Sequence, residues 1–467
     1  MLNNRILRTL VTVLMFTQVL GSYVIFGLWT QRVTRDRKQL RAKLRALHER
    51  NAKRVYDAFA KLKGVYIKVG QFLSTQAALP PEYLMEMAKM QDRNYVAHTD
   101  EIRQRIRELY DGKEAEDIFA WFDNEPLACA SIGQVHKVKL KDGRDAVLKV
   151  KYPGIDQSFN SDLDLLKLMV PIFVAIIERV FYGEKTGIDH RATISEFVKY
   201  IRMELDYTNE VENHRKMYAI LKGRDDVIVP KLYLPYCTSA TICMEFIPAM
   251  KMADFFGSDT VPKSAKDRAY SILVDAMLYQ VARFGFFQAD THPGNFLVQY
   301  NGGDDVRVVF LDFGCSKQLP EAFRQNILRS VQGYINRDAI MSAEAYWNMG
   351  FRTKQQSVES LARWAEFVFG VITSVLEVFQ KGDSLVDFTK RNMRTLGEQG
   401  YELTQSDRID YIPEEYIMFG RALSTPPVPF DKFQPTADLM GLVMGHMIHL
   451  SMPQQDLDYS HEAEHFK

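Results

Sequence analysis

Cysteine is scarce in this chain, and its few cysteines are scattered. The four in 467 residues form no Cys-x-x-Cys pair; they are Cys129, Cys237, Cys243 and Cys315. A structural zinc site or a disulfide framework needs cysteines that are closer together or more numerous. The spacing therefore argues against both, and it suits a reducing compartment.

The chain also lacks an excess of charge of either sign. It has 59 Lys and Arg against 59 Asp and Glu, with a pI near 7.1. A neutral protein has no overall attraction for nucleic acid, so we expect no nucleic-acid partner. The composition, 46% hydrophobic and 25% charged residues without low-complexity segments or repeats, predicts a folded protein of two or more lobes.

Long hydrophobic runs are rare, but one stands near the N-terminus. Residues 10–29 are almost continuously apolar, and a bilayer crossing needs about 20 helical residues. Arg5 and Arg8 are the only charged residues before the run, whereas ten Lys and Arg follow it by residue 54, against two acidic residues. The length of the run predicts a membrane anchor over residues 1–30. The positive-inside rule then places the rest of the chain on the cytoplasmic side.

Two other interpretations of this run stay open. A cleaved signal peptide would need a small-residue cleavage pattern, and none follows the run. A hairpin-inserted or peripheral anchor could instead use the basic stretch on anionic lipid. A second apolar run, residues 165–181, contains four charged or proline residues and is too short and polar to span, so we expect a buried or groove-lining helix there.

The apolar periodicity changes along the rest of the chain. The segment 31–115 predicts helices, at 32–54, 56–75, 81–91 and 100–110. The segment 116–247 contains five strand-like runs, at 126–132, 134–140, 146–150, 227–232 and 241–246, with helices at 158–182 and 194–221. The segment 248–467 is mostly helical apart from one hairpin. This order predicts a helical extension, a small five-stranded lobe and a larger helical lobe.

The residues that most indicate a chemistry lie around that hairpin. Asp290 and Asn295 stand in a loop before an apolar strand, and a second strand ends at Asp312-Phe313-Gly314. In a kinase-like site the loop Asp faces the attacking oxygen, while the Asn and the later Asp hold Mg²⁺. An isolated Asp-Phe-Gly would be weak evidence, because turns use Asp and Gly freely, but the loop spacing and the hairpin make it specific. We therefore expect Asp290 to be catalytic and Asn295 and Asp312 to bind the metal in a bilobal, protein-kinase-like α+β fold.

Such a site also needs a cation on the phosphates of ATP. Lys149 lies in a buried-strand pattern, where a lysine is out of place unless it is paired or bound to a ligand. An edge-strand lysine that points to water is the alternative. Glu210, in an acidic helical segment, would hold Lys149, although that segment could equally be a solvated surface.

The loop expected to cover the phosphates is poor in glycine. Gly133 is its single glycine and would take a positive φ at little cost, so the backbone should approach phosphates differently from a three-glycine loop. We expect this loop and the segment that links the lobes to bind the nucleotide together with Lys149. Their residues are Ala128, Cys129, Ala130, Ser131, Gly133, Gln134, Val135, Glu245 and Ile247.

Two features of protein kinases are missing. Gln288-Ala289 stands where a His-Arg pair usually precedes the loop Asp, so no basic pocket is evident for a phosphorylated activation loop. Residues 319–321 begin a new helix soon after Gly314, which leaves no room for a long activation segment. Both features argue against protein substrates.

In these motifs the chain resembles the UbiB/AarF family of atypical kinase-like ATPases, which is associated with quinone lipid biosynthesis. Lys68-Val69-Gly70-Gln71 fits the family's Lys-x-Gly-Gln signature, and Glu204-x-Asp206 fits its Glu-x-Asp motif. The Ala-rich loop, Lys149, Glu210, Asp290, Asn295 and Asp312 fit the family's other motifs. The match covers roughly residues 50–330, with Cys129 and Thr291 as mild departures where Ala and Pro are expected.

The resemblance implies a helical cover over the nucleotide cleft. In it Lys68, Gly70 and Gln71 would meet Glu204 and Asp206 and block access for peptides. It also implies ATP and Mg²⁺ as cofactors, attachment to a membrane, and a lipid or quinone precursor or a membrane biosynthetic complex as partner. Residues 1–30, 31–115, 116–247 and 248–467 then become the anchor, the extension, the N-lobe and the C-lobe.

Several functions remain to be weighed. The first is an enzyme that hydrolyses ATP, or phosphorylates a small or lipid-like molecule, in support of isoprenoid-quinone metabolism. The second is a non-catalytic nucleotide-binding scaffold of a membrane enzyme complex. The third is a conventional Ser/Thr protein kinase, which the two missing features disfavour. An antibiotic-modifying phosphotransferase would share the catalytic loop but would not explain residues 68–71 or the anchor.

Overall fold

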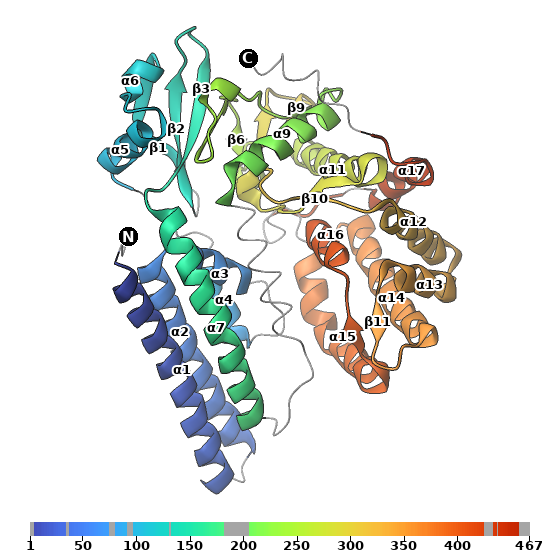
Figure 1. Cartoon of the computed structure of the whole chain (residues 1–467). Helices are drawn as coiled ribbons and strands as arrows, with labels where there is room; N and C mark the ends of the chain where they lie inside the picture. The colour runs from blue at the N-terminus through green and yellow to red at the C-terminus, as the bar shows by residue number, and fades with distance from the viewer. Residues whose placement is uncertain are drawn as a thin grey trace. The chain divides into compact units, whose positions relative to one another are not determined.

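The computed structural model describes residues 4–33, 37–73, 80–90, 97–129, 132–181, 205–424, 433–436 and 438–456. The chain divides into two units (Figure 1). The first consists of Met1–Thr208 with Pro235–Glu245, and the second of Asn209–Leu234 with Phe246–Lys467. Helices and several small sheets together confirm the expected α+β class, and each unit is described by itself below.

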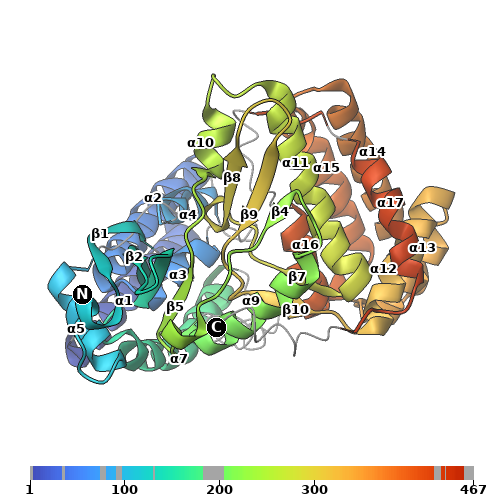
Figure 2. The same cartoon turned by 90° about the horizontal axis from the view of Figure 1, so that it is seen from above.

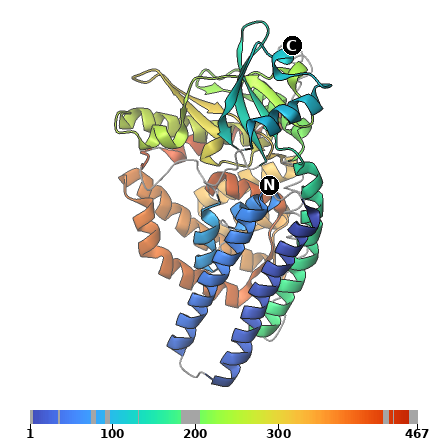
Figure 3. The same cartoon turned by 90° about the vertical axis from the view of Figure 1, so that its left-hand side faces the viewer.

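The first unit combines a long helical bundle with a small sheet. Its helices are α1 (Arg5–Val33), α2 (Arg37–Leu62), α3 (Val65–Leu73), α4 (Pro81–Ala88), α5 (Thr99–Leu109), α6 (Ala115–Ile118) and α7 (Ile155–Phe181). In the bundle, α1 lies between α2 and α7 (Figure 3). Of the helices in the described residues, α1 alone is long and apolar enough to cross a membrane, over Arg5–Leu28.

The helical extension is divided differently from our prediction. We expected a break between 54 and 56, but α2 continues to Leu62 and the chain turns at Lys63 and Gly64. Both residues have φ of 58°, in the left-handed region that a helix does not use. The amphipathic pattern runs through this turn, so periodicity alone could not place it. The expected helix over 165–181 is confirmed as part of α7.

The sheet of the first unit has four strands rather than five. They are β1 (Trp121–Cys129), β2 (Gly133–Lys139), β3 (Asp145–Lys151) and β5 (Thr241–Glu245), all antiparallel in the order β1-β2-β3-β5. The run at 227–232 that we assigned to this sheet forms only a short strand, β4 (Val227–Ile228). It pairs in parallel with β9 of the second unit. A two-residue strand carries no sequence signal for its partner, so the tertiary fold decides where it pairs.

The second unit contains the predicted hairpin and most of the remaining helices. The hairpin consists of β8 (Phe296–Tyr300) and β9 (Val306–Phe310), in a sheet of order β4-β9-β8-β6 with β6 (Met250–Lys251). Helix α11 (Lys263–Tyr279) packs against β9 (Figure 2). It continues into the π-helical turn η2 (Gln280–Phe284), and then β7 (Phe286–Gln288) pairs with β10 (Ser316–Gln318).

Helices surround these strands in the second unit. They are α9 (Tyr207–Leu221), α10 (Met252–Gly257), α12 (Glu321–Asn336), α13 (Ala339–Met349), α14 (Val358–Lys381), α15 (Leu385–Asp407), α16 (Glu414–Ser424) and α17 (Leu439–Ser451). The pair β11 (Arg352–Thr353) and β12 (Ile409–Tyr411) and the short turn η3 (Pro293–Asn295) complete it, while the short turn η1 (Leu234–Tyr236) begins in the second unit and ends in the first. The predicted helix over 194–221 is seen from Tyr207 on, because 182–204 lie outside the described residues.

Helix α17 is held to α11 by a charged cluster. Asp275 accepts hydrogen bonds from His446 at 2.8 Å and from Arg224 at 2.6 Å, and Arg224 also pairs with Asp226. The hydrogen bond from His446, with that from Arg224, lowers the pKa of Asp275 to about 2. The cluster therefore ties the C-terminal helix of the described chain to the centre of the second unit.

This cluster should make stability depend on pH in acid. A carboxyl whose pKa is lower in the folded state stabilises the fold above its unfolded pKa, near 3.8, and loses that contribution as the pH falls toward about 2. We expect a loss of about 1–2 kcal/mol across this window. Urea unfolding of the parent and of Asp275→Asn at several pH values measures it. Equal pH slopes for the two proteins would contradict the assignment.

Candidate active site

The catalytic loop is folded by hydrogen bonds among its own residues. The side-chain amide of Asn295 donates to the backbone carbonyl of Asp290 at 3.0 Å, and the N–H of Gly294 donates to Nδ1 of His292 at 3.0 Å. The N–H of Leu311 donates to the carbonyl of Asn295 at 3.0 Å, which ties the loop to the end of β9. Because the amide nitrogen is used inside the loop, the amide oxygen of Asn295 is the atom suited to bind a metal.

The Asp312-Phe313-Gly314 turn follows β9 directly, as the sequence predicted. Oδ1 of Asp312 accepts from the N–H of Gly314 at 3.0 Å, which fixes the orientation of the carboxylate. Phe313 is fully buried and contacts the ring of His214 edge-on, with centroids 4.9 Å apart. Asp290, Asn295 and Asp312 thus belong to one unit and to one hydrogen-bonded loop and hairpin, and each is partly exposed.

Glu210 on α9 lies beside this turn and is buried. A Cβ atom placed on Gly314 would lie 3.3 Å from Oδ1 of Asp312 and 3.5 Å from Oε2 of Glu210. The two carboxylates therefore flank the glycine, and a side chain at 314 would crowd both of them. The alternative that α9 presents Glu210 on a solvated surface is wrong for this residue.

Two side chains of α9 that sequence reasoning missed hold the turn in place. The amide of Asn213 donates to the carbonyl of Phe313 at 3.0 Å, and His214 hydrogen-bonds through Nε2 with the carbonyl of Pro230 at 2.7 Å. Both are buried. Their spacing from Glu210 places all three within one turn of the helix, which is the signal that could have found them.

A buried pair of glutamines holds the backbone of Asp312 in place. The side chain of Gln288 donates to the backbone carbonyl of Asp312, and Oε1 of Gln280 accepts from the N–H of Gln288 at 3.1 Å. Both glutamines are at most 1% exposed. Gln280 stands at the start of the π-helical turn η2, and such turns often occur at functional sites. Sequence reasoning noted Gln288 only as the replacement of a histidine.

Gln288 should therefore position Asp312 rather than touch substrate. Gln288→Ala removes the donor and leaves a buried carbonyl unsatisfied, which costs about 1–3 kcal/mol, and we expect ATP turnover to fall with a higher Mg²⁺ requirement. Gln288→His can donate to the same carbonyl and should restore most of the turnover. Titrating Mg²⁺ against the ATPase rate of each variant measures this. Identical titrations for the Ala variant and the parent would exclude the positioning role.

Lys149 is buried in the first unit, on the central strand β3. Its Nζ lies 5.0 Å from the ring centroid of Tyr207, and Nζ of Lys151, also buried, lies 5.1 Å from the same ring. The edge-strand alternative for Lys149 is therefore wrong. Lys151 was missed, although alternation along a strand places it on the same face as Lys149. Lys149 and Glu210 belong to different units, so their pairing stays a prediction.

Gly133 is required at the start of β2, but for a reason that differs from our prediction. It is absent from the residues with positive φ. A Cβ atom there would lie 2.4 Å from the backbone oxygen of Val150 and 2.9 Å from the hydroxyl of Tyr207. Glycine is therefore needed because two strands and a ring approach closely, and not because of an unusual backbone angle.

The other residues expected to bind nucleotide have mixed surroundings. Gln134 is fully buried, with Oε1 accepting from the N–H of Ala97 at 3.0 Å and Nε2 2.8 Å from Nε2 of His136, so its side chain serves the interior. Burial raises the pKa of the half-buried Cys129.

The remaining predicted residues are Ala128 at the end of β1, Val135 opposite Lys149 on β2, Glu245 at the end of β5 and Ile247 after it. Ala130 and Ser131 lie outside the described residues.

The predicted cover residues belong largely to the bundle. A Cβ atom on Gly70 would lie 3.0 Å from Cγ of Met90 and 3.5 Å from Phe59, so this glycine lets α3 pack closely. Lys68 is half-buried on α3. Oδ1 of Asp206 accepts from the N–H of Thr208 at 3.0 Å and so caps α9. Contact of Lys68 with Asp206 stays a prediction; Glu204 lies outside the described residues, as does the side chain of Gln71.

The arrangement suits magnesium better than a transition metal. No group of three His, Cys, Asp or Glu side chains able to hold a metal occurs among the residues that the structure describes. Mg²⁺ needs only one or two carboxylates, with waters and phosphate oxygens completing its shell. Asp312 and the amide oxygen of Asn295 meet that requirement, and Glu210 adds negative charge beside Gly314.

Comparisons with known proteins show which family this chain resembles. A family model described as the ABC1 atypical kinase-like domain matches residues 89–346. The Arabidopsis thaliana protein named ACTIVITY OF BC1 COMPLEX KINASE 8, chloroplastic, is 32% identical over 337 residues, covering 72% of this chain and 42% of that protein. The Dictyostelium discoideum protein named probable serine/threonine-protein kinase abkB is 30% identical over 282 residues, covering 59% and 41%. The chain thus spans less than half the length of these relatives.

A solved structure shares the fold. It is described as the complex of Rv3197 with erythromycin from Mycobacterium tuberculosis, and it superposes with a TM-score of 0.52 at 20% sequence identity. The match covers 89% of this chain and 95% of that chain. Together with the matched domain, this likeness confirms the kinase-like fold.

Proposed function

The chain belongs to the ABC1 atypical kinase-like family, and from this premise we propose that it binds ATP with Mg²⁺ and transfers or hydrolyses the γ-phosphate. A kinase-like activity is what the family supports. We further propose that the acceptor is water or a small or lipid-like molecule, and that the activity serves isoprenoid-quinone metabolism at a membrane.

One observation carries the proposal. The loop of Asp290 and Asn295 and the turn of Asp312 are joined by hydrogen bonds through Asn295 and Leu311 within one unit. Preorganised oxygen ligands of this kind favour a metal-bound phosphate without reorganisation during the reaction. Mg²⁺, when bound, neutralises charge on the phosphate oxygens.

Each residue then has a proposed task. Asp290 orients the attacking hydroxyl or water and receives its proton. Lys149 binds the α and β phosphates, and Glu210 orients Lys149. The residues of the Ala-rich loop and Glu245 and Ile247 hold the nucleotide, while the helix of Lys68 and Gly70 covers it. Asn213 and Gln288 keep the turn of Asp312 in position.

The short segment after Gly314 supports a small acceptor over a protein. Only six residues, 315–320, separate Gly314 from α12, and three of them form β10 against β7. A conventional protein kinase binds its peptide on a longer activation segment. Phosphorylation of peptides in trans at a rate comparable with ATP hydrolysis would favour that alternative.

The test compares nucleotide binding with turnover in the full chain. We expect ATP to raise the thermal midpoint and to be hydrolysed with Mg²⁺, and we expect EDTA to abolish hydrolysis. A thermal shift without any Mg²⁺-dependent turnover would favour the non-catalytic scaffold. Adding anionic liposomes and quinone-precursor-like phenols tests the finer proposal, since a lipid-linked enzyme should be stimulated by both.

A further inference from the structure

Helix α1 buries a charged side chain and leaves large apolar side chains exposed, unlike a typical helix of a water-soluble bundle. Its face toward the other helices holds two polar residues, Arg8 and Thr12, beside Met15, Val19 and Tyr23. Arg8 forms a buried ion pair with Asp162 of α7, and Thr12 hydrogen-bonds the hydroxyl of Tyr66 at 2.7 Å. Its outward face holds Ile6, Leu10, Leu14, Ile25 and Leu28, which are 53–72% exposed. Apolar side chains normally face the core of a soluble bundle, whereas charges face the interior of a membrane-embedded one.

Helix α7 extends this apolar face. Leu168 and Ile172 on α7 are also more than half exposed, and the rings of Phe16 and Phe173 meet edge-on at 5.8 Å where α1 and α7 pack. We call these outward residues of α1 and α7 the apolar face. A group of exposed large apolar side chains on neighbouring helices is typical of a site that binds another molecule or a membrane.

Helix α2 is charged and runs along the other side of α1. Ser22 hydrogen-bonds Asn51 at 2.8 Å, Tyr23 hydrogen-bonds His48 at 2.7 Å, and Arg8 donates to the carbonyl of Leu62 at 2.6 Å, so the two helices are in contact along most of their lengths. The exposed side chains of α2 are mostly basic: Arg41, Lys43, Arg45, Arg50, Lys53, Arg54 and Lys61, against Glu49 and Asp57.

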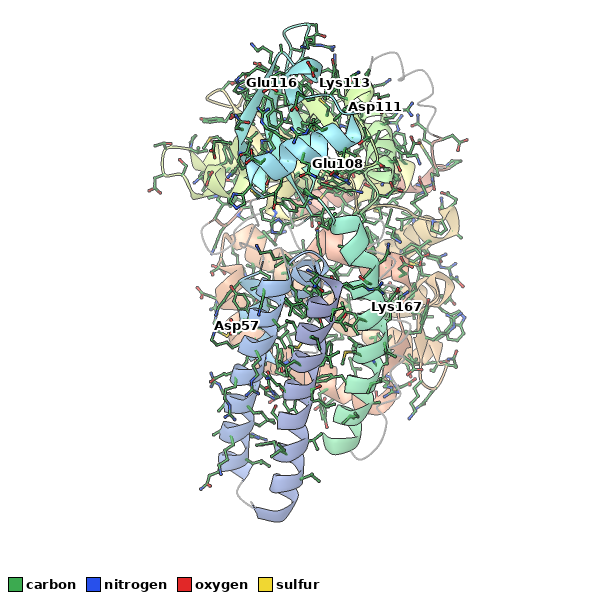
Figure 4. All side chains as sticks on the ribbon, turned by 60° about the vertical axis from the view of Figure 1, so that its left-hand side comes forward. Asp57, Glu108, Asp111, Lys113, Glu116 and Lys167 are labelled. Atoms are coloured by element: carbon green, nitrogen blue, oxygen red, sulfur yellow. The ribbon has the colours of Figure 1, made fainter. Side chains whose placement is uncertain are left out.

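This packing disfavours α1 spanning a bilayer as part of the bundle. A spanning α1 would draw the charged residues of α2 into the hydrocarbon, and each charge there costs about 2.5–3.5 kcal/mol or more. Figure 4 shows Asp57 on α2 and Lys167 on α7 on either side of α1, so charged side chains of both signs lie on the helices that flank α1. Exposed apolar side chains on α1 beside the mostly basic α2 fit an orientation in the plane of an anionic membrane surface.

We propose that the apolar face of α1 and α7 lies in the plane of a bilayer that contains anionic lipid, with the Arg and Lys residues of α2 at the level of the headgroups. The charge of α2 selects lipid over a second copy of the chain, because two copies joined at this face would bring two basic helices together. The inference specifies the membrane attachment proposed above and is independent of the nucleotide chemistry.

The test measures binding of the full chain to vesicles by co-sedimentation. We expect binding to phosphatidylcholine vesicles that contain phosphatidylglycerol, and much weaker binding to phosphatidylcholine alone. The double variant Leu10→Gln/Leu14→Gln should bind about tenfold more weakly or worse, because two apolar side chains that would enter the membrane are lost. The matched control Ile335→Gln/Ile340→Gln exchanges two exposed isoleucines of α12 and α13 and should bind like the parent.

The contribution of charge is tested separately. Lys43→Gln/Arg50→Gln should lower binding to the anionic vesicles by about fivefold for each charge removed, and high salt should do the same to the parent. Each variant must keep the parent's thermal midpoint and its ATP-induced shift. Asp312→Asn should bind vesicles like the parent, so a failure of the nucleotide assignment stays distinguishable from a failure of this one.

Three results would overturn the proposal. Retention of the bound protein after alkaline carbonate extraction would indicate a spanning helix, which requires α1 to leave the bundle. A dimer in solution that Leu10→Gln/Leu14→Gln dissociates, without vesicle binding by the parent, would show that a second copy covers this face. Equal vesicle binding by that variant and the parent would show that the apolar face takes no part.

Discussion

Asp312→Asn is expected to lower Mg²⁺-dependent ATP hydrolysis by about a thousandfold while leaving the protein folded. The amide has nearly the same shape as the carboxylate but lacks its charge, so it binds Mg²⁺ far more weakly. Oδ1 of residue 312 can still accept from the N–H of Gly314, and the backbone carbonyl can still accept from Gln288. The loss should therefore reflect the metal rather than a collapsed turn.

The measurement is the steady-state ATPase rate against Mg²⁺ concentration, with the thermal midpoint as the check on folding. Asp304→Asn is the matched control, because Asp304 is an exposed aspartate in the turn between β8 and β9 and should leave the rate unchanged. Hydrolysis by Asp312→Asn at the parental rate would end the assignment of Asp312 as metal ligand. Rates lowered equally in both variants would point to a general effect of charge.

Asp162→Ala is expected to destabilise the first unit by about 3–5 kcal/mol. Arg8 and Asp162 have side chains 2% and 5% exposed, and removing the carboxylate leaves the guanidinium in the interior without the charge that neutralises it. Burial raises the pKa of Asp162, and the hydrogen bond with Arg8 opposes that rise. Removing one partner of a buried ion pair lowers the free energy of unfolding more than replacing both partners with apolar residues.

Chemical unfolding followed by circular dichroism, with limited proteolysis of the N-terminal helices, measures this effect. Asp164→Ala serves as the control, since Asp164 is exposed on the same helix two residues away. The double variant Arg8→Met/Asp162→Leu should recover most of the stability, because apolar side chains of similar size can fill the space. A double variant as unstable as Asp162→Ala would show that packing rather than charge is lost.

The local chemistry of the site was predictable because it is encoded in short spacings. The loop from Asp290 to Asn295 and the hairpin leading to Asp312 formed as expected, since each is closed by contacts between residues near in sequence. Lys149 was identified because a charged residue inside an apolar strand is rare without a reason. The same logic would have found Lys151.

Other features depend on contacts between distant segments, and the sequence carried no local signal for them. Three contacts are of this kind: the pairing of β4 with β9, the hydrogen bond from Asn213 to the carbonyl of Phe313, and the close approach of Gly133 to Val150. In each, the two residues meet only because of the whole fold. Gly133 illustrates the difference. We expected a glycine there because glycine can adopt a positive φ, whereas the structure needs it because a side chain would collide with Val150 and Tyr207. The break at Lys63 and Gly64 likewise interrupts a pattern that continues on both sides.

The sequence by itself determined the family, the kinase-like class, the candidate metal-binding residues and the presence of one long apolar helix, because motif spacing and hydropathy are properties of the chain. Only the tertiary structure decided how that helix packs. It showed that Arg8 and Thr12 of α1 turn inward to Asp162 and Tyr66, while several leucines and isoleucines of the same helix are exposed beside a basic helix. Hydropathy measures how apolar a segment is, whereas the direction of each side chain is set by the helices packed against it.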